Sequence, residues 1–267
     1  MNAAGDIHVE LKSVTRTYAA RAGHGAIHAL GPVDLTLRRG EFVGVVGPSG
    51  CGKSSLLEIV AGLAMPSTGR VTFEGALVEG RVPNGVGVVF QEDASFPWLT
   101  VGDNVAFGLK RAGIDAAEIA RRVDHAIGLM GLNQFRKAYP SQLSGGMRQR
   151  VCIARTLVLR PRLILLDEPF GALDQQTRLL MGEELLRLWR DSGATVMLIT
   201  HSLDEAAMLS DRVAVMSSRP GRFLEMLETG WPRDRDSRIV ADPRFGQFTS
   251  RLWELIRDES RKALDLP

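Results

Sequence analysis

A glycine-rich stretch at residues 47–54 constrains the fold of this chain more than any other feature. Its sequence, GPSGCGKS, matches the pattern G-x-x-x-x-G-K-[ST] of the phosphate-binding P-loop. The apolar residues 42–46 before it predict a buried parallel strand, and residues 55–63 after it predict a helix. A strand, a glycine loop and a helix in this order are the context that the motif requires. The chain is therefore expected to have an α/β core that binds phosphate groups.

The residue types in this loop suit phosphate chemistry. Glycines let backbone N–H groups approach phosphate oxygens, and the helix N-terminus adds unpaired donors and a partial positive charge. We expect Lys53 to reach the β- and γ-phosphates of a nucleotide and the Ser54 hydroxyl to ligate Mg²⁺. An ordinary glycine turn is the alternative, which the flanking strand and helix disfavour. The nucleotide-binding residues predicted here are Gly47, Pro48, Ser49, Gly50, Cys51, Gly52, Lys53, Ser54 and Ser55.

Composition and charge limit the classes of protein to consider. Apolar residues make up 45% of the chain and charged residues 24%, and the formal net charge of +2 argues neither for nor against nucleic acid. No apolar run approaches the roughly 20 residues that span a bilayer. The N-terminal residues lack the features of a signal peptide, so we expect a cytosolic protein whose membrane role would need a partner. Cys51 and Cys152 are expected to be free thiols, because a disulfide at Cys51 would obstruct the nucleotide.

Two kinds of apolar pattern predict two β layers. Apolar and polar residues alternate at 7–11 and 33–37, and with a short strand at 71–73 they favour a small antiparallel layer. Continuous apolar runs at 86–90, 163–166 and 195–200 instead predict buried strands of the nucleotide-binding core.

Residues 92 to about 158 interrupt this strand-rich pattern. Thr100 can cap a helix over 101–110, and Asp115 can open a second helix that ends near Met130. We therefore expect a helical sub-domain inserted into the α/β core.

The C-terminal part, residues 228–267, predicts a linker followed by a helix. Residues 231–242 are charged and poorly periodic, as a linker would be. Residues 245–263 predict an amphipathic helix with an apolar side. That side carries Phe248, Leu252, Leu255 and Ile256.

Two acidic residues end the apolar run at 163–166. Asp167 is expected to hold Mg²⁺, directly or through water, and Glu168 to orient and deprotonate a water molecule. An isolated Asp-Glu-Pro after a strand would more often be a turn, but the P-loop earlier in the chain favours the Walker B interpretation.

Three further positions are weaker as isolated signals. Gln91 and His201 follow apolar strands, and ligands of open α/β sheets bind at the carboxyl ends of strands. A surface glutamine and a structural histidine are the ordinary alternatives. Ser144, Gly145 and Gly146 stand at a predicted helix N-terminus, which would make a second anion site, although Ser-Gly-Gly alone is usually a turn.

Taken in order, these motifs resemble those of ABC-transporter ATPase subunits over about residues 7–227. The resemblance covers the signature motif, residues 143–150, which other P-loop ATPases lack. It implies an α/β fold: a P-loop NTPase core with an antiparallel β layer and the helical sub-domain at about 92–158. It also implies roles for single residues: Tyr18 stacks on adenine, Gln91 lies in the Q-loop and contacts the metal with Ser54 and Asp167, Asp174 lies in the D-loop, and His201 is the switch histidine. Tyr18 could instead pack against the β layer.

A narrower resemblance concerns the nitrate, sulfonate and taurine importers. Residues 96–101, residues 103–109 and residues 218–222 are similar to that group. The resemblance implies an ATP-hydrolysing subunit that energises the import of a small anion. Where the family often has Ser-Thr, this chain has Ser54 and Ser55, which keeps both hydroxyls.

The family mechanism implies partners and cofactors. Two subunits would stack head to tail with ATP and Mg²⁺ between them, each ATP lying on one P-loop and under residues 144–146 of the other subunit. Permease subunits would dock near Phe96 and Trp98, although these aromatics could instead be local core. An extracytoplasmic substrate-binding protein would act indirectly, no nucleic acid is expected, and the protein would lie at the cytoplasmic face of the inner membrane.

Two other functions fit the sequence less well, because the chain shows one cassette, no heptads, a net charge of only +2 and the signature motif. A soluble ABC ATPase in DNA repair, translation or cluster assembly would tend to have two cassettes, a long coiled coil or a basic surface. A small-molecule kinase would share the P-loop but not the signature motif.

Overall fold

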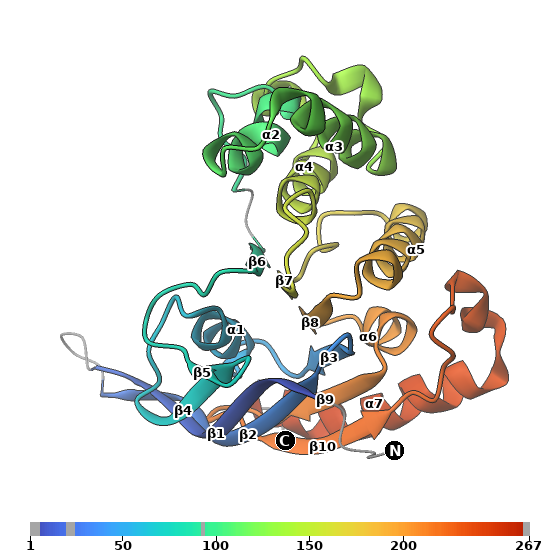
Figure 1. Cartoon of the computed structure of the whole chain (residues 1–267). Coiled ribbons are helices and arrows are strands. Elements are labelled where there is room, and N and C mark those ends of the chain that lie inside the picture. The colour runs from blue at the N-terminus through green and yellow to red at the C-terminus, as the bar shows by residue number, and fades with distance from the viewer. Residues whose placement is uncertain (1–5, 20–24, 92–93, 264–267) are drawn as a thin grey trace.

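The computed structural model describes residues 6–19, 25–91 and 94–263. These residues form two sheets and three groups of helices (Figure 1). The first sheet is antiparallel, in the order β2-β1-β4-β5. Its strands are β1 (Ile7–Tyr18), β2 (Ile27–Arg38), β4 (Thr68–Phe73) and β5 (Ala76–Leu77). The predicted antiparallel layer is therefore present, and the predicted fold class is confirmed.

The second sheet has the order β10-β9-β3-β8-β7-β6. Its strands are parallel except for β10, which pairs antiparallel with β9 at one edge. They are β3 (Phe42–Val46), β6 (Val86–Val89), β7 (Leu163–Asp167), β8 (Thr195–Ile199), β9 (Arg212–Met216) and β10 (Phe223–Glu228).

Every residue of β3, β7 and β8 is buried, because both faces of this sheet are covered. Within β7, Leu163 and Leu165 pack in the core between the two sheets, together with α1 (Lys53–Ala61). Ile164 and Leu166 point to the opposite core, which the other helices cover. The continuous apolar runs seen in the sequence reflect this burial on both sides.

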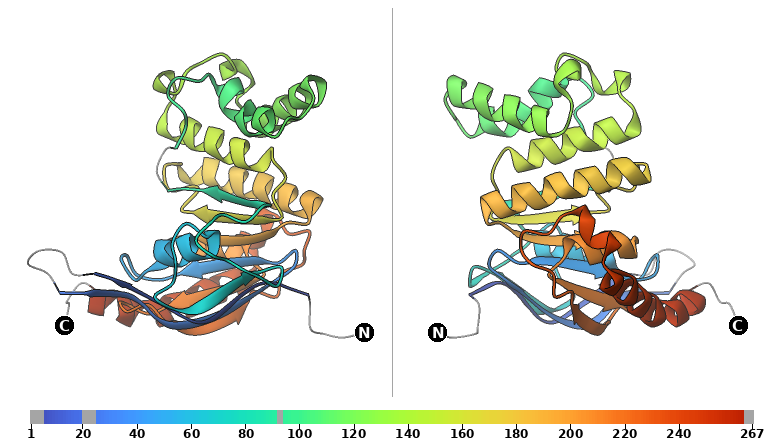
Figure 2. Two further views of the ribbon diagram at one scale, coloured as in Figure 1. Left: turned by 60° about the vertical axis from the view of Figure 1, so that its left-hand side comes forward. Right: turned by 90° about the vertical axis from the view of Figure 1, so that its right-hand side faces the viewer.

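Helices α2 (Val101–Arg111), α3 (Ala116–Leu129) and α4 (Gly145–Leu157) lie between β6 and β7 in the chain. Two short 3-10 turns, η1 (Asn133–Phe135) and η2 (Pro140–Gln142), join α3 to α4. Both views of Figure 2 place α2 and α3 beyond α4, on the side away from the antiparallel sheet. The caps predicted at Thr100, Asp115 and Ser144 all accept backbone N–H groups of their helices.

The remaining helices follow β7, β8 and β10 in the chain. They are α5 (Gln175–Ser192), α6 (Leu203–Leu209) and α7 (Pro243–Ala263), with the 3-10 turn η3 (Ser237–Ala241) before α7. The predicted apolar side of α7 is present: Leu252 and Ile256 are buried against β3, β9 and α6, and Phe248 and Leu255 are partly buried there. Among the described residues, no helix combines the length and apolarity needed to cross a bilayer.

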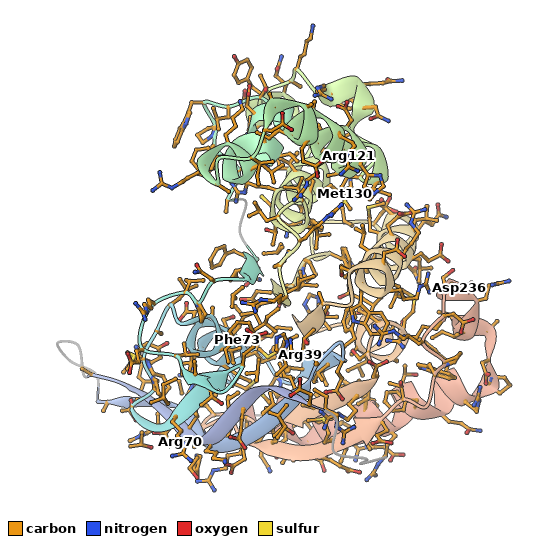
Figure 3. The ribbon with its side chains drawn as sticks, in the orientation of Figure 1. Arg39, Arg70, Phe73, Arg121, Met130 and Asp236 are labelled. Atoms are coloured by element: carbon orange, nitrogen blue, oxygen red, sulfur yellow. The ribbon has the colours of Figure 1, made fainter. Side chains whose placement is uncertain are left out.

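The segment predicted as a linker, residues 231–242, packs against the body of the molecule between β10 and α7. Trp231 is buried and its Nε1–H donates to the carbonyl of Ala207 at 2.8 Å. Arg235 is 2% exposed and pairs with Asp211 at 2.7 Å. Figure 3 labels Asp236 on this segment, beside the body of the molecule. The charged composition was misleading because the arginine is buried in a specific set of contacts.

The predicted alternation of apolar and polar residues at 7–11 does not hold at the first residue of β1. Ile7 is 49% exposed, while His8 is 1% exposed and lies 2.5 Å from the Thr195 hydroxyl through Nδ1. The pairing of β1 with β2 is irregular between Ile7 and Val9, which shifts the faces of the strand there. Strand β2 begins at Ile27, before the alternating residues 33–37 from which it was predicted, and residues 20–24 lie outside the described part.

Candidate functional site

The P-loop connects β3 to α1 at the carboxyl end of the parallel sheet. Gly50 and Gly52 have φ of 73° and 107°, in the left-handed region that favours glycine. A Cβ on Gly52 would also lie 2.7 Å from the carbonyl oxygen of Ala29. No side chain caps α1, so its first backbone N–H groups face the loop. Lys53 is buried, and its Nζ donates to the carbonyl of Gly47 at 2.8 Å.

A pocket of about 440 Å³ opens beside this loop. It brings together most of the residues predicted for one nucleotide site, from four separate segments of the chain. Its lining consists of Tyr18, Ile27, Ala29, Ser49, Gly50, Gly52, Lys53, Ser54, Ser55, Gln91, Glu168 and Arg219. Three of these, Ile27, Ala29 and Arg219, were not predicted as site residues.

Two predicted residues, Gln91 and His201, contact one side-chain oxygen atom of a third, Glu168. The Gln91 side-chain amide donates to Glu168 Oε2 at 3.0 Å, and His201 Nδ1 lies 3.1 Å from the same oxygen. They come from the carboxyl ends of β6, β7 and β8, which are neighbours in the sheet. Glu168 itself has φ of 46°, a conformation that costs energy for a residue with a Cβ. Strain of this kind is common where a catalytic side chain must be held in one direction.

Asp167 ends β7 beside the P-loop. Its side chain is 7% exposed, and its Oδ1 is buried without a hydrogen-bond partner among the described residues. Burial raises the pKa of Asp167, while a hydrogen bond from Ser54 opposes the shift.

These atoms fit a small divalent cation. An unpaired carboxylate oxygen next to a hydroxyl supplies the hard oxygen ligands that Mg²⁺ prefers, with water and phosphate oxygens completing its shell. No cluster of three or more His, Cys, Asp and Glu side chains suited to a metal ion occurs within residues 6–19, 25–91 and 94–263. A cation at Asp167 would take part of its shell from the phosphate oxygens of a nucleotide.

Tyr18 lies at the rim of the pocket. Its hydroxyl is 2.9 Å from the Ser55 hydroxyl, and the guanidinium of Arg16 lies 4.5 Å from the ring centroid. Because Arg16 covers one face of the ring, a base could stack only on the other face.

The Cys51 side chain does not belong to the pocket. It is 1% exposed, and burial raises the pKa of its thiol. Only the backbone of Cys51 can therefore contribute to a phosphate site. Cys51 and Cys152 are both thiols outside any disulfide, as predicted, and both are buried.

The signature residues and Asp174 lie outside this pocket. Ser144 caps α4 by accepting the Met147 N–H at 3.3 Å, and Asp174 caps α5 by accepting the Thr177 N–H at 2.9 Å. Bonds from Thr177 lower the pKa of Asp174. A Cβ on Gly146 would lie 2.6 Å from Leu173 Cδ2, so glycine lets α4 begin close to the D-loop. In a single chain these residues therefore have visible structural roles.

An aromatic surface flanks the Q-loop. Trp98 is 70% exposed and stacks on Phe96 with ring centroids 5.6 Å apart. Phe96 also contacts Phe107, which is itself exposed. The buried Asn104 fixes this loop, since its Nδ2 donates to the carbonyls of Phe96, Leu99 and Thr100. Trp98 is therefore not a core residue, and residues 92–93 of the loop lie outside the described part.

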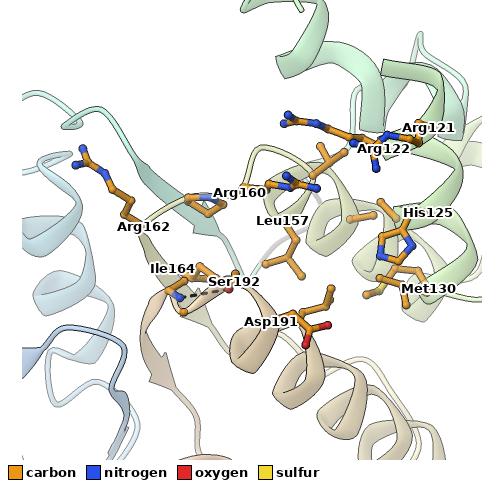
Figure 4. Close-up of a pocket in the computed structure, with 18 of the residues that line it drawn as sticks. Arg121, Arg122, His125, Met130, Leu157, Arg160, Arg162, Ile164, Asp191 and Ser192 are labelled. Atoms are coloured by element: carbon orange, nitrogen blue, oxygen red, sulfur yellow. Dashed lines mark hydrogen bonds between the residues drawn. The ribbon is translucent and has the colours of Figure 1, made fainter. Parts of the chain in front are cut away.

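A larger cavity of about 660 Å³ lies between α3, α4 and α5 (Figure 4). None of the predicted nucleotide residues lines it, and it lies near the amino ends of β7 and β8, where Arg162 and Ala194 precede the strands. Several of its arginines are paired: Glu118 binds Arg121 and Arg122, and Glu74 binds Arg39 and Arg162. Ligands of such sheets bind at the carboxyl ends of strands, so the P-loop pocket is the stronger candidate.

Comparisons with known proteins identify the family of this chain. The ABC transporter family matches residues 30–171. The nitrate import ATP-binding protein NrtD of Synechocystis is 39% identical over 257 residues, 94% of this chain and 96% of that protein. The taurine import ATP-binding protein TauB of Pelagibacter ubique is 47% identical over 199 residues, 74% of each chain.

A solved structure is similar to this chain in its fold. The ATP-binding cassette MJ0796, solved as a dimer in a post-hydrolysis state bound to ADP and Pi, has a TM-score of 0.75 and 32% identity. The match covers 84% of this chain and all of that one. This chain therefore belongs to the ABC transporter family and is an ATP-binding subunit with ATPase activity, similar to those of nitrate and taurine importers.

Proposed function

We propose that this protein hydrolyses ATP to energise an importer of a small anion such as nitrate, a sulfonate or taurine. The observation that carries the proposal is the meeting of Gln91, Glu168 and His201 beside the P-loop. The relatives named for nitrate and taurine import support the anion class. In this proposal residues 7–227 are the ATPase domain and residues 228–267 a C-terminal segment.

The proposed chemistry follows from the positions of the side chains. The P-loop N–H groups and Lys53 bind the phosphates, and Tyr18 stacks on the adenine. Glu168 accepts a proton from the attacking water while Gln91 and His201 hold its carboxylate in place. In-line transfer to water depends mainly on positioning and charge stabilisation, which this arrangement can supply.

Magnesium is the expected cofactor. When bound, it would neutralise charge on the β- and γ-phosphates. Ser54, Asp167 and Gln91 are the residues proposed to hold it, and the unpaired Oδ1 of Asp167 supports this assignment.

Two copies are proposed to work head to tail. Ser144, Gly145 and Gly146 offer backbone N–H groups at the start of α4, yet they do not line the pocket of their own chain. In a dimer they would cover the nucleotide of the other copy, and Asp174 would lie at the same interface. The dimeric structure of the MJ0796 cassette supports this arrangement.

A permease is the proposed membrane partner. Exposed Trp98 and half-buried Phe96 form an apolar surface on a loop that Asn104 fixes by hydrogen bonds, which suits a protein interface. Docking there would place the protein at the cytoplasmic face of the inner membrane. A substrate-binding protein outside the cytoplasm would deliver the anion to the permease.

Growth of a deletion strain tests the substrate class. The strain is supplied with nitrate as sole nitrogen source, and with taurine or an alkyl sulfonate as sole sulfur source. We expect growth to fail on one of these anions and to be restored by the wild-type gene but not by Glu168→Gln. Normal growth on all of them would contradict the anion assignment.

A further inference from the structure

The loop between β9 and β10, residues 217–222, lies directly against the P-loop. Gly221 N–H donates to the carbonyl of Ala29 at 3.0 Å, and its own carbonyl accepts the Gly31 N–H at 3.0 Å. A Cβ on Gly221 would lie 2.1 Å from the carbonyl oxygen of Cys51, so only glycine allows this close approach. The loop is therefore fixed against both β2 and the phosphate-binding segment.

Arg219 extends from this loop into the nucleotide pocket. Its Nε and Nη2 donate to the carbonyl of Gly50 at 3.1 and 2.9 Å, and it lines the same pocket as Lys53 and Ser54. A guanidinium has five N–H donors, so more than half remain for another acceptor. In the part of the chain that the structure describes, no carboxylate forms an ion pair with Arg219. Its charge therefore adds to that of Lys53 at the rim of the phosphate site.

The C-terminal helix fixes the residue before Arg219. Glu259 of α7 is 9% exposed, and its Oε2 accepts both the backbone N–H and the hydroxyl of Ser218 at 2.7 Å. Its other oxygen pairs with Lys262 at 2.6 Å. Leu252 and Ile256 anchor the same helix in the core. A chain of contacts thus joins α7 to the P-loop through Ser218 and Arg219.

We propose that Arg219 binds the phosphates of the nucleotide held by the P-loop of its own chain, and that Glu259 positions it. A guanidinium matches phosphate oxygens with paired, charge-assisted hydrogen bonds, which favours phosphate over the neutral base as its target. The inference rests on the proposed nucleotide site and adds a second cation to it, supplied by a loop outside the matched residues 30–171.

Calorimetric titration with MgATP and MgADP tests the role of Arg219. Arg219→Ala should weaken both affinities by roughly five- to tenfold, as expected for a charged contact at a partly exposed site. Arg219→Lys should restore part of the loss, because it keeps the charge. Arg222→Ala, in the same loop but outside the pocket, is the matched control and should bind like the wild type.

Salt dependence separates a phosphate contact from a structural effect on the P-loop. Arg219→Gln keeps amide donors for the Gly50 carbonyl but removes the charge, so its MgATP affinity should fall less steeply with added salt than that of the wild type. An unchanged salt slope would show that Arg219 only supports the loop. If Arg219→Ala binds MgATP like the wild type while Lys53→Ala binds it weakly, the role of Arg219 is overturned and the nucleotide site stands. If Lys53→Ala also binds MgATP like the wild type, the nucleotide site itself is overturned.

A double-mutant cycle tests the positioning by Glu259. Glu259→Gln should weaken MgATP binding by roughly two- to fivefold, and adding it to Arg219→Ala should cause no further loss, because both act through one contact. Glu254→Gln on the same helix, where Glu254 is exposed and pairs with Arg251, is the control. Additive losses would show that Glu259 does not act through Arg219.

Discussion

At the scale of single residues, the pocket is arranged around Glu168. Sequence patterns placed Gln91, Glu168 and His201 at the ends of strands, and the parallel sheet brings those ends together because β6, β7 and β8 are neighbours. Arg219 could not be found this way. Its loop reaches the P-loop only because β9 pairs with β3, a long-range pairing that no local pattern encodes.

Lys53→Ala should abolish measurable ATPase activity and strongly weaken ATP binding, because it removes the ammonium held within the loop. Calorimetry with MgATP measures the affinity, and Lys110→Ala, an exposed lysine paired with Asp103, serves as the control. Unchanged ATP affinity in Lys53→Ala would contradict the role of this residue.

Asp167→Asn should raise the stability of the nucleotide-free protein while removing activity. Because burial raises the pKa of Asp167, folding disfavours its charged form, and its contribution to stability declines as pH rises through the range between the unfolded and folded pKa values. At neutral pH the substitution, which removes this charge, should therefore raise Tm, and the gain should shrink at acidic pH. A lower Tm in a thermal melt would show that the charge is compensated in the fold.

At the scale of elements, the sequence predicted those helix ends that depend on contacts within a few residues. Thr100, Asp115 and Ser144 cap helices through bonds to residues two or three positions away, so their roles were visible in the sequence. The packing of segment 231–242 could not be predicted from its composition, because it depends on distant partners such as the Ala207 carbonyl that Trp231 binds.

The aromatic loop before α2 supports a prediction about assembly. Trp98→Ala should weaken co-purification with the permease while nucleotide affinity and Tm stay close to wild type, because the side chain is exposed. Trp253→Ala is a matched control, since Trp253 is 53% exposed on α7, away from this loop. Undiminished co-purification of Trp98→Ala would exclude Trp98 from the interface.

At the scale of the whole molecule, the residues predicted for the nucleotide fall into two groups. The P-loop and Glu168 line one pocket and His201 contacts Glu168, whereas Ser144 and Asp174 cap helices outside that pocket. Sequence alone predicted the two sheets and the inserted helices. In the proposed head-to-tail dimer, each group would complete the site of the other chain.

Glu168→Gln tests the central claim most directly, because it keeps the shape of the side chain and removes the oxygen that would accept the proton. The account predicts a fall in ATPase rate of about 10²–10⁴-fold. MgATP binding should survive or tighten, since a negative charge beside the triphosphate is lost. Size-exclusion chromatography in MgATP should then show an ATP-bound dimer that the wild-type protein does not accumulate. Near-native turnover by Glu168→Gln would contradict the account and move the base elsewhere, with His201 the next residue to substitute.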